Sequence, residues 1–275
     1  MHAGGKVGIL CGGGLLPKLV AEALQANQQP FFLVVLEGQN QRDWYQNYPH
    51  VVVAMGSVGL ILKMLRENDV KVLTLAGSVK RPSLDKLKLD WQGVKWLARM
   101  KLFRSGDDQT LSWVIDALAK EGFEVQAPHD FIPQALTPKG VLTTVQPDAD
   151  AFRDMDRGFD VAKTLGALDV GQAVIVEHGL VLSVEGIEGT AEMIKRTKAL
   201  KREDKKTGAL IKAAKPQQTK LADLPAIGPD TIDQLADCGL AGVALEAGSS
   251  LILDLDQTLA KANKKGIFVY GYVKE

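Results

Sequence analysis

Apolar residues in the first half of the chain follow two alternating patterns. Short blocks of aliphatic and β-branched residues, typical of buried strands, alternate with stretches in which apolar residues recur every three or four positions, as on one face of a helix. Strands that alternate with helices predict a parallel sheet with crossover helices, and therefore a Rossmann-like α/β domain. The expected strands are 7–10, 31–36, 51–54 and 72–75, and the expected helices are 16–26 and 57–68.

The apolar pattern loses its period over residues 128–147. Before this stretch, a helix is expected over 107–121, because carboxylates stand at its start and Gly122 stands at its end. Within 128–147, prolines and a glycine interrupt the apolar runs, so we expect a domain boundary near Ala135. The expected domains are 1–135 and 136–275.

The second half mixes the same two patterns and predicts another α/β domain. A helix is expected over 148–168, and the apolar runs 173–176 and 180–184 are joined by a turn that contains a histidine, which predicts a hairpin. Basic residues dominate 195–215, but acidic residues interrupt them and aromatic residues are missing, which favours a solvated helix face over a nucleic-acid patch. Further strands are expected at 243–245, 251–253 and 267–272, and further helices at 230–238 and 254–265.

Composition narrows the classes of function. Hydrophobic residues make up 46% of the 275 positions, enough for a substantial core, and 33 basic residues balance 33 acidic ones. A chain without net charge has no broad field that attracts nucleic acid, so no nucleic-acid partner is expected. The only cysteines, Cys11 and Cys238, do not suggest a disulfide framework. Because no apolar run approaches the length of a membrane span, we expect a cytoplasmic protein that reaches a membrane only by surface contact.

Three consecutive glycines, Gly12, Gly13 and Gly14, separate the first expected strand from the first expected helix. Pro17 stands near the first helical turn, where its missing N–H is tolerated. Glycines let a ligand approach the backbone closely, and amides at a helix N-terminus favour an anion. This turn, with Leu15 after it, predicts a phosphate-binding site, and a tight strand-to-helix connection is the alternative.

A dinucleotide site is a second interpretation of this half. Glu37 follows the second expected strand at the spacing at which a Rossmann fold binds ribose, but Pro17 stands where the dinucleotide fingerprint has its third glycine. This difference favours a mononucleotide over NAD. Gly77 and Ser78 follow the fourth expected strand, at the edge where α/β ligands gather, so Ser78 either binds phosphate or ribose or bonds to its own loop.

The second half also carries several polar segments framed by glycine and proline. Such turns hold side chains at fixed angles, as a pyrophosphate site requires if carboxylates are to position a divalent metal and an attacking water. Lys215 would offset phosphate charge. The segments are 185–190, 215–218, 223–228, 239–243 and 246–248.

These segments, in this order and together with the N-terminal motifs GGGLLP, AGSVKRP and GDD, resemble the UDP-2,3-diacylglucosamine pyrophosphatases of the LpxI type. The likeness runs nearly end to end, and the ordered set is more specific than any single motif. It implies Mg²⁺-dependent hydrolysis of UDP-2,3-diacylglucosamine to UMP and 2,3-diacylglucosamine 1-phosphate, called lipid X, in lipid A synthesis. It also implies a homodimer. A substrate with two acyl chains further predicts an apolar slot near the domain junction and contact with the inner leaflet.

Within this resemblance, Asp223 is the acid most critical for catalysis, as a metal ligand or as a group that orients water. From the residues alone, a turn-capping aspartate is the simpler interpretation of Asp223. The glycine turn of the first domain would hold the UDP moiety. The binding residues that the resemblance implies in the second domain are Gly189, Thr190, Lys215 and Gln217. Glu188 is a candidate for a second carboxylate of the site, and an exposed acid in a turn is the alternative.

Two classes of function therefore stay open. In the first, the protein is a metal-dependent hydrolase whose first domain holds the nucleotide and whose second domain supplies Asp223. In the second, it is either an NAD-binding oxidoreductase that uses Glu37 for the ribose or a nucleotide sensor without catalytic activity.

Overall fold

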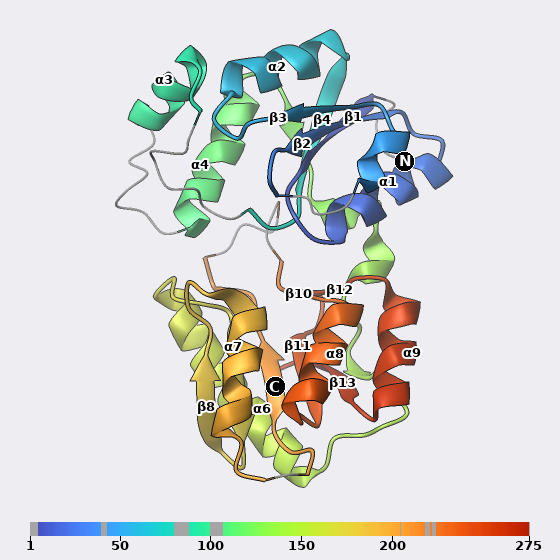
Figure 1. The fold of residues 1–275 in the computed structure, drawn as a ribbon, viewed down its shortest axis with the longest axis vertical. Coiled ribbons are helices and arrows are strands. Elements are labelled where there is room, and N and C mark those ends of the chain that lie inside the picture. Colours follow the sequence, from blue (N-terminus) through green and yellow to red (C-terminus); the bar gives the residue numbers. More distant parts are fainter. Residues whose placement is uncertain are drawn as a thin grey trace. The chain divides into compact units, whose positions relative to one another are not determined.

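The chain divides into two compact units, which we describe separately (Figure 1). Unit 1 holds the residues up to Ile132 together with Leu221, and unit 2 holds the other residues from Pro133 onward. The structure is a computed structural model that describes residues 5–39, 43–79, 88–99, 107–203, 205–217, 221 and 224–274.

The sheet of unit 1 has five parallel strands in the order β3-β2-β1-β4-β5. The chain starts in the middle of the sheet, moves to one edge and then crosses to the other side of β1. This reversal is the switch point at which doubly wound α/β folds bind ligands, and the strand order confirms the Rossmann-like prediction. The strands are β1 (Lys6–Cys11), β2 (Phe31–Leu36), β3 (His50–Val53), β4 (Val70–Ala76) and β5 (Glu124–Val125).

Helices cover both faces of this sheet. Residues of α2, α3 and α4 share one apolar cluster with Phe32, Val34 and Leu73 of the sheet, whereas α1 contacts β1 and β4 together with α5. The sequence pattern predicted α1, α2 and α4, and the structure adds α3 and α5. The elements are α1 (Leu16–Ala26), η1 (Trp44–Asn47), α2 (Val58–Glu67), α3 (Trp91–Arg99), α4 (Asp107–Lys120) and α5 (Pro128–Phe131).

Unit 2 is built on a mixed six-stranded sheet in the order β6-β13-β11-β9-β7-β8. Strands β9, β11 and β13 are parallel, β7 is antiparallel to both β8 and β9, and β6 is antiparallel to β13. This confirms the predicted mixed α/β fold. The strands are β6 (Gly140–Val141), β7 (Ala173–Glu177), β8 (Leu180–Val184), β9 (Ala209–Lys212), β11 (Gly242–Glu246) and β13 (Phe268–Tyr272), and β10 (Ala226–Ile227) pairs with β12 (Leu251–Ile252) in a separate ribbon.

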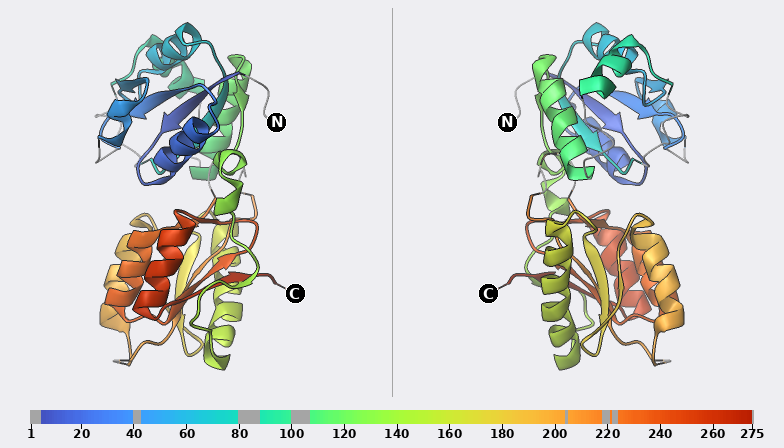
Figure 2. Two further views of the ribbon diagram at one scale, coloured as in Figure 1. Left: turned by 90° about the vertical axis from the view of Figure 1, so that its right-hand side faces the viewer. Right: turned by 90° about the vertical axis from the view of Figure 1, so that its left-hand side faces the viewer.

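Helix α6 covers one face of this sheet, and α7, α8 and α9 cover the other (Figure 2). Successive residues of a strand point to opposite faces, so Leu210 and Val243 pack under α7 to α9, while Ile211 and Ala244 pack under α6. The central strands are therefore buried on both sides. The helical elements are η3 (Pro133–Ala135), α6 (Ala149–Ala167), α7 (Gly189–Thr197), η4 (Lys198–Leu200), α8 (Pro229–Cys238) and α9 (Leu255–Lys265).

The prediction of a solvated helix face over 195–215 is wrong. Helix α7 ends at Thr197, and the apolar run Ala209–Lys212 forms β9, a central strand that is buried along its whole length. Pairing with β7 on one side and β11 on the other satisfies the backbone of this short run. The basic residues around it dominate the local composition, but tertiary pairing decides the structure of the run.

Candidate active site

The carboxyl ends of several strands meet at one edge of the unit 2 sheet. Strand β9 ends at Lys212, β11 ends at Glu246, and Glu185 directly follows β8, which runs in the same direction. Ligands of open α/β sheets bind outside the carboxyl ends of strands. The segments that contain Thr190 and Lys215 continue from these strand ends, so the structure brings the segments of two predicted residues, Thr190 and Lys215, to one edge.

A chain of hydrogen bonds links two buried charged side chains at this edge. The Thr190 hydroxyl donates to Glu185 Oε1 at 2.5 Å and accepts from Lys212 Nζ at 3.1 Å. Lys212 also donates to the carbonyl of Ala226 at 3.1 Å, and Glu185 Oε2 accepts the amide of Gln172 at 3.0 Å. Only 5% of Lys212 and 8% of Glu185 are exposed. Lys212 therefore joins the start of α7 to the strand that follows residue 223.

An ion pair fixes the backbone that leaves β9. Lys163 of α6 donates to both carboxylate oxygens of Glu246, at 2.8 and 2.7 Å, and to the carbonyl of Ala214 at 2.9 Å. The amide of Ala214 donates to Glu246 Oε2 at 2.8 Å. Because both backbone groups of Ala214 are bonded, the segment after β9 is held between α6 and the end of β11.

Lys215 and Gln217, both predicted to bind substrate, bond to the end of α6. The Lys215 ammonium lies 2.5 Å from Asp169 Oδ1, and both side chains are largely buried. Gln217 Nε2 donates to the carbonyl of Gly166 at 2.7 Å. These contacts anchor the segment that leads toward residue 223. Lys215 thus meets a carboxylate of the protein, and its charge is balanced locally.

Glu188, the predicted second carboxylate, faces Arg196 about two turns along α7. Arg196 donates to Glu188 Oε1 through Nη2 at 2.8 Å and to the carbonyl of Val184 at 2.6 Å. The hydrogen bond from Arg196 holds the pKa of Glu188 below its ordinary value. Gly189 begins α7 with a φ of +80°, a conformation that favours glycine. The loop before α7 therefore has a fixed shape and an ionised acid.

Asp223 lies outside the residues that the structure describes. Among the residues that it does describe, no group of three or more His, Cys, Asp or Glu side chains gathers in a way that could hold a metal ion. The carboxylates at this edge, Glu185 and Glu246, each accept bonds from protein donors.

The glycine turn of unit 1 packs directly against the loop after β4. Gly12 donates to the carbonyl of Ala76 at 2.8 Å, and Gly13 and Ser78 exchange two backbone hydrogen bonds at 2.7 and 3.0 Å. A Cβ on Gly12 would lie 2.6 Å from the Ser78 carbonyl oxygen, and a Cβ on Gly77 would lie 2.4 Å from that of Gly13. These glycines allow two loops to meet at the switch point, and the amides of Gly12 and Gly13 are not directed at a ligand.

Gly14 and Leu15 form the rest of this turn and lead into α1. Gly14 has a φ of +88° with open space at its Cβ position, and Leu15 caps α1 without a side-chain bond. Within the described part of the chain, the amides of Leu15 and Leu16 donate no hydrogen bond. Ser78 is exposed beside them. Glu37 follows β2, where its carboxylate is exposed and lies 4.0 Å from Lys88.

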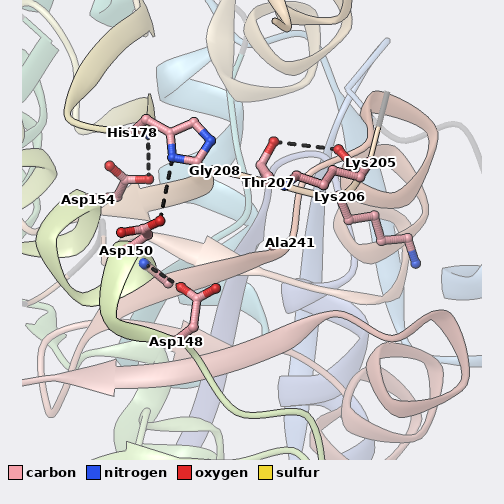
Figure 3. Close-up of a pocket in the computed structure, with 10 residues that line it drawn as sticks. Asp148, Asp150, Asp154, His178, Lys205, Lys206, Thr207, Gly208 and Ala241 are labelled. Atoms are coloured by element: carbon pink, nitrogen blue, oxygen red, sulfur yellow. Dashed lines mark hydrogen bonds and ion pairs between the residues drawn. The ribbon is translucent and has the colours of Figure 1, made fainter. Parts of the chain in front are cut away.

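A polar pocket of about 190 Å³ opens at the opposite edge of the unit 2 sheet (Figure 3). Its acidic residues have structural partners: Asp154 accepts the amides of His178 and Gly179 at 3.0 and 2.6 Å, and His178 contacts Glu203 at 3.0 Å and Asp150 at 3.7 Å. Asp154 thus stabilises the predicted hairpin turn, which the structure confirms. The lining residues are Asp148, Asp150, Ala151, Asp154, His178, Lys205, Lys206, Thr207, Gly208 and Ala241.

Sequence reasoning missed the ion pairs that organise the carboxyl edge. Lys212 carried one usable signal, since it is a charged residue at the end of an otherwise apolar run, and a buried lysine requires partners. Lys163 and Glu246 are 83 positions apart, and no local pattern connects them.

Comparison with known proteins covers both units. The model of the family described as "LpxI N-terminal domain" matches residues 6–135, and that described as "LpxI C-terminal domain" matches residues 138–270. The curated "UDP-2,3-diacylglucosamine pyrophosphatase LpxI" of Caulobacter vibrioides is 38% identical over 272 residues, which cover 97% of each chain. Among solved structures, "CobK precorrin-6A reductase" matches 98% of this chain and 90% of its own at 12% identity, with a TM-score of 0.33.

Proposed function

The chain belongs to the LpxI family, and we propose that it hydrolyses the pyrophosphate bond of UDP-2,3-diacylglucosamine to UMP and 2,3-diacylglucosamine 1-phosphate. The observation that carries this proposal is the 38% identity to a pyrophosphatase of that substrate over 97% of both chains. Because the similarity is continuous across both family domains, it includes the nucleotide-facing turn as well as the carboxyl edge of unit 2.

The reaction belongs at the carboxyl edge of the unit 2 sheet. Hydrolysis of a phosphoanhydride needs charge stabilisation and a water held in line with the leaving group. The buried ammonium of Lys212 and the start of α7, where Gly189 and Thr190 lie, supply positive charge there. Asp223, which follows in the chain before β10, orients the attacking water and takes part in binding the metal.

Mg²⁺ is the proposed cofactor. When bound, it would neutralise phosphate charge at the cleaved bond. Oxygen ligands suit Mg²⁺, which keeps several waters and needs only one or two carboxylates beside the phosphates of the substrate. Asp223 is the protein ligand that we propose. Glu185 instead accepts a hydrogen bond from Thr190, and Glu246 pairs with Lys163, so these two carboxylates hold the structure around the site.

The first domain, residues 1–135, binds the uridine nucleotide, and the second, residues 136–275, carries out catalysis. The unbonded amides of Leu15 and Leu16 at the positive end of α1 suit a phosphate oxygen, with Gly14 leaving room for it. Ser78 is the neighbouring hydroxyl. We also propose a homodimer that touches the membrane surface to reach its lipid substrate. In the described parts of the chain, no helix is long and apolar enough to span a bilayer.

Release of UMP tests the proposal. Purified protein should form UMP and lipid X from UDP-2,3-diacylglucosamine in Mg²⁺, and EDTA should stop the reaction until Mg²⁺ is restored. Asp223→Ala should lose activity by about 10²-fold or more without losing its thermal transition. Asp230→Ala, an acid in the first turn of α8, is the matched control and should retain activity. No UMP from the wild-type enzyme, or full activity in Asp223→Ala, would contradict the proposal, and tight NAD binding without UDP binding would replace it with the dinucleotide alternative.

A further inference from the structure

Three apolar side chains stand exposed beside the carboxyl edge of unit 2. Ile187, in the loop before α7, is fully exposed, and Leu168 and Val170, in the loop after α6, are 70% and 48% exposed. Isolated exposed apolar residues are ordinary, but three on two neighbouring loops are a feature to explain. We call Ile187, Leu168 and Val170 the apolar rim.

The two loops that carry the apolar rim are fastened to each other. Gly171 lies against Glu185 so closely that a Cβ would be 2.2 Å from the Glu185 carbonyl oxygen. The next amide, that of Gln172, donates to the Glu185 carboxylate at 3.0 Å. Val170 directly precedes this contact and Ile187 follows it by two residues. The rim is therefore held in a fixed place. Glu185, which joins the two loops, is also the first residue of the hydrogen-bonded series that runs through Thr190 to Lys212.

Charges next to the rim are neutralised by pairing. Lys215 bonds to Asp169, which lies between Leu168 and Val170, and Arg196 bonds to Glu188, which follows Ile187. A surface that docks on anionic lipid gains its affinity from cations offered to the membrane. Three side chains are also few for contact with a second copy, because a stable interface needs roughly 20 to 30 residues from each partner. An apolar rim among paired charges suits a hydrocarbon chain.

We infer that the apolar rim binds an acyl chain of the substrate and makes binding depend on chain length. This inference rests on the proposed function, which supplies a substrate with acyl chains beside a diphosphate. With the diphosphate at Thr190 and Lys212, the sugar and its chains leave along the loops that carry Leu168, Val170 and Ile187. When methylene groups of the acyl chain cover these side chains, apolar surface of both is removed from water, which favours binding.

Chain-length series test the rim. Ile187→Ser and Leu168→Ser should each raise KM for a tetradecanoyl substrate about tenfold, as expected for one exposed aliphatic contact, and leave KM for a butanoyl analogue and kcat unchanged. Since both residues are exposed, thermal unfolding should stay at the wild-type temperature. Leu180→Ser is the matched control: Leu180 is 45% exposed but begins β8, at the opposite edge of the sheet, and its substitution should change neither KM.

Binding of the same two ligands, measured calorimetrically without turnover, separates this inference from the proposed function. If the wild-type protein hydrolyses nothing yet binds the long-chain ligand more tightly, and Ile187→Ser removes that preference, the proposed function fails and the rim stands. If the protein hydrolyses both substrates and Ile187→Ser leaves their KM ratio unchanged, the rim is refuted and the function stands. If Ile187→Ser sediments less with phosphatidylglycerol vesicles than the wild type does, while its KM ratio for the two substrates is unchanged, the rim contacts the membrane and the inference is overturned.

Discussion

Replacement of Lys212 by Met perturbs the candidate site at its buried cation. Met fills most of the space of the lysine stem but cannot donate to Thr190 Oγ1 or to the carbonyl of Ala226, both 3.1 Å from Nζ in the wild-type structure. It also removes the positive charge that lies one hydroxyl away from the Glu185 carboxylate, which is itself buried. The variant therefore leaves buried acceptors and an acid without their cation.

The expected loss of stability follows from this burial. Removing one member of a buried charged network costs roughly 3–5 kcal/mol, because the remaining groups stay desolvated without compensation. At roughly 3 °C per kcal/mol for a chain of this size, the Tm should fall by roughly 10 °C. Well below the new Tm, kcat for UMP release should still fall by about 10²-fold, because a charge that stabilises the phosphates is lost.

Calorimetry and a UMP-release assay at a temperature where the variant is folded measure the two effects separately. Lys205→Met is the matched control, since Lys205 is 73% exposed at the opposite edge of the sheet and should change neither quantity. Lys212→Arg keeps the charge and should recover part of the Tm and of kcat. If Lys212→Met unfolds within about 2 °C of the wild type, Lys212 is not held as described, and if its kcat is unchanged, the ammonium plays no part in the reaction.

Two further predictions concern residues away from this edge. Burial opposes ionisation of Glu177, but hydrogen bonds from Lys201 and Thr207 outweigh burial and hold the pKa of Glu177 below its ordinary value. The ionised carboxylate therefore stabilises the fold above about pH 4.3, and this contribution is lost as the pH falls. Lys201→Met should lower stability at pH 7 and abolish that loss in acid, as denaturant titrations across pH would show; parallel pH curves would contradict this. Gly77→Ala should lower the Tm more than Gly14→Ala, because both have positive φ but only Gly77 would bring a Cβ within 2.4 Å of a backbone oxygen; equal Tm values would refute the packing argument.

Elements with one clear period could be predicted closely from the sequence. Helix α1 was predicted over 16–26 and spans Leu16–Ala26, and α6 was predicted over 148–168 and spans Ala149–Ala167. In both, apolar residues at helical spacing and the residues near the helix start agree. The sequence pattern did not predict strand β9. Its four residues lie inside a basic stretch, and they form a strand only because they pair with two strands that are far away in sequence.

The candidate site was predicted in part, for a related reason. The family resemblance named Thr190 and Gln217, and the structure places the segments that carry them at the carboxyl edge of the unit 2 sheet. The choice of cation differs: the sequence favoured Lys215, and the structure pairs Lys215 with Asp169 while burying Lys212 among the groups of the site. Lys212 and Lys215 are three positions apart, and the end of β9 determines which of them faces the site. Amino-acid composition does not determine where β9 ends.

The glycine turn shows how one motif can serve packing and binding at once. Gly12, Gly13 and Gly77 are explained by the close approach of two backbones, since any Cβ there would meet a carbonyl oxygen or its neighbours at less than 3 Å. Gly14 has no such neighbour, so packing does not require it. If the nucleotide binds at this switch point, the contact must therefore pass through Gly14 and the amides after it. A Gly14→Ala variant that retained full affinity for UDP would leave only the packing role.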